Sequence, residues 1–232
     1  MSEPLTYVLE GDVAVLRMDD GKANALSHAM IDGLQRCLER AASEAGAVAL
    51  LGRPGMLSAG FDLATMGAGP EAARALVTAG AELLLRLYEW PQPVVVGATG
   101  HALAAGALLL CAADTRIGAT GAFKIGLNEV AIGMTLPIFG VELARDRLSK
   151  RHFTAAVIQA RIHDPEAAVA AGYLDRIVAP ETLEAELLSA ADALAQLPRS
   201  AYAGTKRHAR GAVAAAIRET LEEDMARITG GR

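Results

Sequence analysis

The sequence has few cysteines and does not begin like a secreted protein. Its two cysteines, Cys37 and Cys111, form no C-x-x-C pair and have no metal-type spacing with histidine. The first residues, MSEPLTYVLEGD, lack a basic stretch followed by a long apolar one, so they do not resemble a signal peptide. We therefore expect a reduced, cytoplasmic protein without a metal site.

Positive charge is also in short supply. The chain has 22 Lys and Arg against 27 Asp and Glu, a net charge of -5, which argues against nucleic acid as a partner. A small anionic ligand stays compatible with this balance, because a local patch of arginine and lysine can bind one on an acidic protein. With 52% hydrophobic residues over 232 positions, we expect one large globular domain or a domain with a helical extension.

One segment lacks charge altogether. The twenty residues from Val94 to Ala113 contain no Asp, Glu, Lys or Arg, which is long enough to span a bilayer. Gly97, Gly100 and His101 interrupt it, however, and no basic cluster flanks it. A buried strand that runs into a buried helix is the better interpretation, so we expect no membrane span.

The hydrophobic pattern predicts strands that alternate with helices in the N-terminal part. Strands are expected in a hairpin at 6–18 around Gly11-Asp12, and at 47–52, 94–100, 114–119, 123–126 and 176–179. Helices are expected at 28–44 behind a Ser27 cap, at 71–88 and at 107–113, with a loop at 58–70 and a turn at 100–106. The chain is mostly helical from Pro137 onward, and no internal repeat is visible. This order indicates a layered fold of the βαβ type.

Two turns rich in small residues, SAGFDL at 58–63 and GHALAAG at 100–106, are candidates for ligand contact. Small residues let the backbone approach a ligand closely, and the first N–H groups of a helix have no partner within it. If the two turns face each other, they supply two N–H donors to one oxygen, which is an oxyanion hole. Tight packing of a turn against a strand is the alternative.

The sequence contains no pattern typical of a serine nucleophile or of a metal site. Ser58 lies in GMLSAG, which is not the G-x-S-x-G of a nucleophile elbow, so pairing with His101 is not indicated. The other histidines lie in predicted helical stretches without carboxylates at ligand spacing: His28, His152, His163 and His208.

Glu129 is the carboxylate that the sequence singles out. It lies in the apolar segment from Phe123 to Met134. An ionised carboxylate in apolar surroundings is costly unless paired, and burial raises its pKa. Glu129 is therefore either a group that moves a proton or a structural partner of an arginine.

Five segments occur in an order typical of one superfamily. They are GKANALS at 21–27, SAGFDL, GHALAAG with LLCAAD, GLNEVAIGMTLP at 126–137, and AAGYLDRIV at 170–178. Together they resemble the crotonase, or enoyl-CoA hydratase/isomerase, superfamily over nearly the whole chain. The resemblance implies an α/β fold of the ClpP/crotonase type, a spiral of ββα units. It further implies a core at 1–180 and a helical region at 181–232 that builds trimers or hexamers of this chain.

The resemblance also implies a site. An acyl-CoA would bind with its thioester oxygen between the backbone amides of Phe61 and Ala105. Hydratases of the superfamily use two glutamates, and their first position falls on Leu108 here, while the second is Glu129. The segment IGLNE is most similar to isomerases that shift a 3-double bond of an enoyl-CoA to the 2-position with one glutamate. The resemblance therefore favours such an isomerase; the alternatives are a hydratase or other acyl-CoA enzyme, and a non-catalytic acyl-CoA-binding protein.

Substrate contacts follow by position in the superfamily. Adenine and ribose contacts are implied at Lys22, Asn24, Ala25 and Leu26, and a nucleotide contact at Lys206 beside Arg207. The remaining implied contacts surround the acyl group: Ser58, Ala59, Gly60, Asp62, Leu63 and Leu108. No cofactor is expected beyond the coenzyme A that the substrate carries.

Overall fold

A mostly parallel sheet forms the base of the molecule. In the computed structural model, which describes residues 4–228, β1 (Leu5–Glu10) and β2 (Val13–Met18) form the expected antiparallel hairpin. Strands β3 (Ala47–Leu51), β5 (Val94–Ala98), β7 (Thr115–Ala119) and β9 (Arg176–Val178) then add in parallel, in the order β1-β2-β3-β5-β7-β9. The inner strands β3 and β5 are wholly buried, as their unbroken apolar sequences predict.

A second, smaller parallel sheet lies beside the first. Its strands are β4 (Gly55–Ser58), β6 (Gly100–Leu103) and β8 (Ile125–Gly126), in that order. Each follows a strand of the large sheet and precedes a helical segment, so β3-β4, β5-β6 and β7-β8 are repeats of one ββα step. The expected ββα spiral is confirmed. Strand β4 was not predicted, and the turn expected at 100–106 was wrong in part, because both strands are only four residues long.

The helices surround the two sheets. Helix α1 (His28–Glu44) begins as predicted, with the Ser27 hydroxyl accepting the Met30 N–H. The other helical segments are α2 (Leu63–Gly67), α3 (Pro70–Glu89), α4 (Ala105–Ala112), a 3₁₀ turn (Val130–Ile132), α5 (Ile138–Arg147), α6 (Lys150–Phe153), a π turn (Thr154–Ile158), α7 (Pro165–Ala171), α8 (Leu183–Ala195) and α9 (Arg199–Ile228). Helix α2 lies in the predicted loop, where the Asp62 carboxylate caps it by accepting the Thr65 N–H.

The charge-free segment is a core element. It forms β5, β6 and α4, and every residue of α4 is buried. Within residues 4–228, no helix has both the length and the apolar character needed to cross a membrane.

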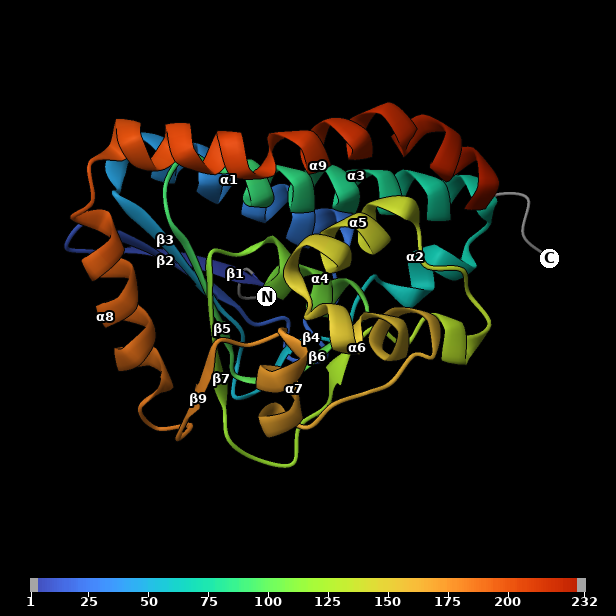
Figure 1. Ribbon diagram of the computed structural model, residues 1–232, viewed down its shortest axis with the longest axis horizontal. Coiled ribbons are helices and arrows are strands. Elements are labelled where there is room, and N and C mark those ends of the chain that lie inside the picture. Colours follow the sequence, from blue (N-terminus) through green and yellow to red (C-terminus); the bar gives the residue numbers. More distant parts are fainter. Residues whose placement is uncertain (1–3, 229–232) are drawn as a thin grey trace.

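The C-terminal helices pack on their own chain. Helix α8 covers one face of the large sheet against β3 and β5, and α9 runs along α3 and α5 (Figure 1). A second, smaller core forms between α8 and the sheet, with Leu187 and Ala191 against Val15 and Val95. Region 181–228 is thus packed tightly against the part expected as a separate core, while trimer formation stays a prediction.

Candidate active site

Glu129 is a buried carboxylate without a partner. It lies three positions after the end of β8 and immediately before the 3₁₀ turn, and the residue is only 8% exposed. Its Oε2 atom accepts no hydrogen bond, and no arginine or lysine of residues 4–228 forms an ion pair with it. Burial raises the pKa of the Glu129 carboxyl. These observations argue against Glu129 as the structural partner of an arginine. They agree with a carboxylate that accepts a proton more readily than an exposed glutamate does.

The two turns of small residues meet. Gly60 has a φ of +106°, and a Cβ built on it would lie 2.9 Å from Ala104 Cβ and 3.5 Å from the Ala105 nitrogen. Ala104 itself has a positive φ of 51° and precedes α4. The backbones of the two turns are therefore in direct contact, and side chains larger than those present would separate them.

The geometry leaves two amides without acceptors. Leu26 forms a parallel bridge to Phe61 by donating to Gly60 O (2.9 Å) and accepting from the Asp62 N–H (3.3 Å). Such a bridge uses the neighbours of Phe61, so the Phe61 N–H points away from Leu26. Ala105 is the first residue of α4, where an N–H has no intrahelical acceptor. These two amides are therefore candidates for the donors that an oxyanion hole requires.

Glycines position both amides. The Phe61 ring packs against α3 at Gly80, where a Cβ would approach Phe61 Cζ to 2.5 Å. On α4, a Cβ at Gly106 would lie 2.8 Å from the Ser58 carbonyl carbon, so α4 rests directly on the end of β4. Ser58 is buried, and its hydroxyl accepts the Gly60 N–H (3.2 Å). Ser58 therefore shapes the turn, in line with the absence of a nucleophile elbow.

Leu108, the position at which the resemblance implies a second acid in hydratases, is a buried apolar residue. It lies one helical turn after Ala105 and is 1% exposed. A Cβ at Gly140 on α5 would contact both Leu108 Cδ1 (3.3 Å) and Leu136 Cδ1 (3.0 Å). This wall offers neither charge nor hydrogen bond to a water molecule.

Comparison with known proteins identifies the family to which this site belongs. A family model described as enoyl-CoA hydratase/isomerase matches residues 9–228. The chain belongs to the enoyl-CoA hydratase/isomerase family. The resemblance seen in the sequence is therefore confirmed, and an acyl-CoA substrate fits this family.

Relatives of this family carry both activity names. The chain is similar to an enoyl-CoA hydratase/isomerase family protein from Pseudomonas syringae, at 41% identity and a TM-score of 0.95, covering 97% of this chain and 98% of that one. It resembles a protein of Mycobacterium tuberculosis at 38% identity and a TM-score of 0.93, covering 97% and 99%, which is called an enoyl-CoA isomerase in one solved structure and a probable enoyl-CoA hydratase in another. Human mitochondrial enoyl-CoA delta isomerase 1 is 29% identical over 92% of this chain and 72% of its own length. Proteins named as probable hydratases, for example from Bacillus subtilis, match as well.

Only part of the family's expected nucleotide segment is open to a ligand. Asn24 is wholly buried with a φ of 48°, and its side chain bonds Met18 O (2.9 Å) and Met56 O (3.2 Å). Leu26 is buried too. Ala25 is half-buried and donates its N–H to Asp20 Oδ2. Lys22 is exposed, and the Arg53 guanidinium bonds its carbonyl oxygen, which places a second cation beside it. Sequence reasoning missed Arg53.

The prediction for Lys206 needs correction. Its ammonium is buried and bonds Asp114 Oδ2 (2.7 Å) and Gln92 O (3.3 Å). Burial lowers the pKa of Lys206 to about 8, against the opposing effect of Asp114. Arg210 pairs with the same carboxylate at 2.9 Å. Helix α9 folds back over its own chain, and the bond of Lys206 to Asp114 links α9 to the start of β7. Because its ammonium is buried in this bond, Lys206 is not available to a nucleotide.

The other expected contacts differ in exposure. Ala59 is exposed and Leu63 is 78% exposed, so the start of α2 forms an apolar rim beside Phe61. Asp62 serves as the α2 cap, which lowers its pKa. No group of three or more His, Cys, Asp or Glu in the described chain is arranged to hold a metal ion.

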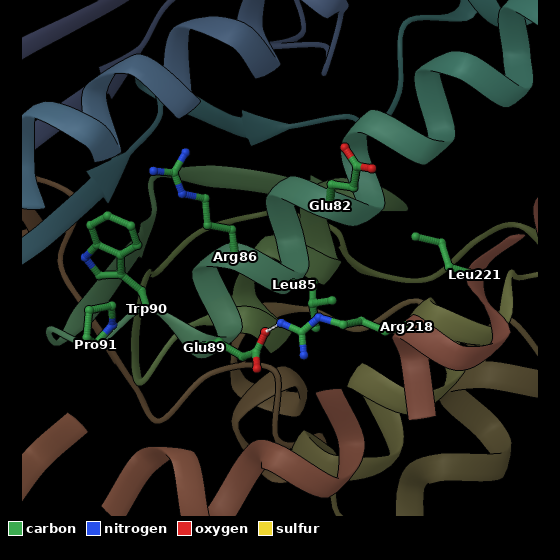
Figure 2. Close-up of a pocket in the computed structure, with 8 residues that line it drawn as sticks. All are labelled: Glu82, Leu85, Arg86, Glu89, Trp90, Pro91, Arg218 and Leu221. Carbon is green, nitrogen blue, oxygen red and sulfur yellow. Dashed lines mark hydrogen bonds and ion pairs between the residues drawn. The ribbon is translucent and has the colours of Figure 1, made fainter. Parts of the chain in front are cut away.

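A hollow elsewhere on the surface is unrelated to these residues. A depression of about 480 Å³ lies between α3 and α9. Figure 2 shows the residues that line it. Its arginines are engaged, since Arg218 pairs with Glu89, and Arg86 bonds Gln35 and approaches Glu39 to 3.6 Å. It contains neither Glu129 nor the two amides and offers no free cation to a phosphate. Its lining residues are Glu82, Leu85, Arg86, Glu89, Trp90, Pro91, Arg218 and Leu221.

Proposed function

We propose that the protein is an isomerase that shifts the 3-double bond of an enoyl-CoA to the 2-position. The observation that carries the proposal is a buried carboxylate, Glu129, that forms no ion pair within residues 4–228, while the position at which the resemblance implies a second glutamate is the apolar Leu108. Isomerisation removes a proton from C2 and returns one to C4. One carboxylate can do both, because it holds the proton between the two steps.

The chemistry assigns a role to each group. The Glu129 carboxylate takes the C2 proton, and the electron pair of that bond moves onto the thioester oxygen to give an enolate. The Phe61 and Ala105 amides bind that oxygen, and each such donor contributes about 3–4 kcal/mol to lowering the barrier. The enolate then collapses, the double bond forms between C2 and C3, and C4 takes the proton from Glu129. No atom is gained or lost overall.

Hydration makes other demands. A water molecule must be held over C3 and deprotonated while C2 receives a proton, which two carboxylates divide between them more naturally than one. Leu108 provides no group for that water. A hydratase is the second candidate because proteins with that name are among the relatives. A non-catalytic binder is disfavoured, since burying Glu129 without a partner is costly unless the carboxylate has a task.

Coenzyme A binding and assembly complete the proposal. Lys22 and Arg53 form the cationic patch to which we assign the nucleotide phosphates. We further propose a homo-oligomer, trimer or hexamer, in the cytoplasm. A mass from light scattering near that of three or six chains of 24.1 kDa supports the assembly, and a monomer at micromolar concentration contradicts it.

The test of the proton carrier is Glu129→Gln, which keeps size and hydrogen bonding but removes the base. Turnover of 3-hexenoyl-CoA, followed by absorbance of the conjugated thioester, should fall at least about 100-fold. Binding of the acyl-CoA should change little. Glu166→Gln on the exposed side of α7 is the matched control and should keep full turnover. Near-native turnover of Glu129→Gln would remove Glu129 from the mechanism.

A further inference from the structure

Several buried polar atoms around Glu129 have no hydrogen-bond partner. They include Glu129 Oε2, the Tyr173 hydroxyl and both ring nitrogens of His163. An unsatisfied buried polar group costs about 1–3 kcal/mol, and most such groups in native proteins are paired, many through water. Backbone groups close to these side chains, at Leu127 for Tyr173 and at Ile125 for His163, supply at most part of their hydrogen bonds, and bridging water is the usual way in which such buried atoms are satisfied.

Fixed elements hold these side chains close to Glu129. Tyr173 follows α7 and is wholly buried. Its ring centroid lies 5.7 Å from that of His163. His163 exchanges two backbone hydrogen bonds of 2.9 Å with Ile125, a residue of β8 only four positions before Glu129. The negative charge of Glu129 also helps to raise the pKa of the Tyr173 hydroxyl, after burial and Cys111, which places the two groups within electrostatic reach.

The cluster continues toward the surface through His152. The His152 ring on α6 lies 6.5 Å from the His163 ring, and His152 is half-buried beside the exposed Arg151. Burial and the neighbouring Arg161 and His152 lower the pKa of His163, so its imidazole is neutral at pH 7. A neutral imidazole and a phenol each donate and accept a hydrogen bond, which is what proton transfer along a chain requires.

We propose that Tyr173, His163 and His152, joined by bridging water, form a proton-exchange route between the Glu129 carboxyl and solvent. The proposal rests on the isomerase function. Once Glu129 has taken the C2 proton, it either returns that proton to C4 or exchanges it along the route. In an exchange, one substrate proton leaves and one solvent proton arrives, so charge and electrons are unchanged. None of the three residues contacts the substrate, and their role is to set how much of the transferred proton comes from solvent.

Isomerisation of 3-hexenoyl-CoA in deuterated water tests the route, with deuterium at C4 of the product measured by mass spectrometry. We expect incorporation by the wild type, and a decrease of at least about threefold in Tyr173→Phe with turnover within about threefold. The direction of the change in deuterium incorporation distinguishes a lost exchange route from a damaged active site. A damaged site returns the proton more slowly, which gives deuterium more time to enter and raises incorporation.

Two further variants complete the design. Tyr88→Phe removes another buried phenol hydroxyl, bonded to Asp146 Oδ2 at 2.7 Å, and should incorporate deuterium like the wild type. His152→Ala removes the imidazole at the solvent end of the proposed route, at a half-buried position. It should lower deuterium incorporation even if Tyr173→Phe does not fold. A wild type that incorporates no deuterium, or unchanged or increased incorporation in both Tyr173→Phe and His152→Ala, overturns the proposal.

An infrared measurement on the free enzyme is independent of the reaction. The spectrum is recorded at a pH low enough to protonate Glu129. The carbonyl band of its carboxyl group, identified by its loss in Glu129→Gln, should move to higher frequency in Tyr173→Phe because a hydrogen-bonded link is broken. An unmoved band contradicts the route. Absence of conjugated product from the wild type would instead refute the isomerase function, so the two failures are distinguishable.

Discussion

Gly80→Ala tests how the fold positions the oxyanion hole. The added methyl would approach Phe61 Cζ to 2.5 Å, roughly 1–1.5 Å short of a normal carbon–carbon contact. Helix α3 cannot move easily, because Leu76, Leu83 and Leu84 anchor it in the core. The half-buried Phe61 ring must yield, and its backbone amide moves with it.

The expected magnitude follows from the donor that is displaced. Complete loss of one donor costs about 3–4 kcal/mol, and a misplacement of about 1 Å can cost about 100-fold in rate. We therefore expect Gly80→Ala to lower kcat on 3-hexenoyl-CoA by about 10- to 100-fold. The free energy of unfolding should change less, since alanine also favours the helix by up to about 1 kcal/mol.

Rescue and control variants make the result specific. Phe61→Leu combined with Gly80→Ala makes room for the methyl and should recover most of the lost kcat. Gly211→Ala adds a methyl in α9 where no atom lies within 4 Å, and it should leave kcat unchanged. If Gly80→Ala keeps kcat within about twofold of wild type, or the double variant shows no recovery, the Phe61 ring does not position the amide.

Other expectations concern charge. Because burial raises the pKa of Glu129, ionisation of its carboxyl group opposes folding as pH rises through that pKa. Glu129→Gln should therefore raise Tm at pH 8 but not at pH 4. An equal Tm difference at the two pH values would contradict this. Because the base must be ionised to take a proton, kcat/KM should fall as pH is lowered through the pKa of Glu129. This fall should occur at a pH above the usual pKa range of a glutamate. Lys206→Met should lower the free energy of unfolding by about 1.5–3 kcal/mol without changing KM, whereas a nucleotide contact would raise KM. Lys22→Ala and Arg53→Ala should raise KM for acyl-CoA but not for the matching acyl-pantetheine, and equal effects on both substrates would exclude a phosphate contact.

Local signals in the sequence predicted local structure well. The Ser27 cap, the hairpin at Gly11-Asp12 and the buried strands β3 and β5 depend on residues close in the chain, and all are present. Strands β4 and β6 were missed because they are short and pair with each other across more than forty positions of sequence. Without them the ββα repeat cannot be recognised from the hydrophobic pattern, and the family resemblance supplied it.

The site was predictable in its main groups and not in its surroundings. Glu129 stood out as a charge in an apolar segment, and the small residues marked both turns. His163 and Tyr173 carry no local pattern, because only the packing of α7 against β8 brings them toward Glu129. Lys206 was assigned to the nucleotide by its position in the family resemblance, and nothing in the sequence indicated that the return of α9 over the sheet buries it.

The most direct measurement of the central claim compares two reactions of one enzyme preparation. The rate of conversion of 3-hexenoyl-CoA to the conjugated 2-enoyl product is measured beside the rate of 3-hydroxyhexanoyl-CoA formation from 2-hexenoyl-CoA, with products identified by mass. A single carboxylate, with the apolar Leu108 at the position of the second glutamate, predicts that isomerisation is much the faster of the two. Hydration that clearly exceeds isomerisation would show that Leu108 does not prevent water activation, and the one-glutamate account would be wrong.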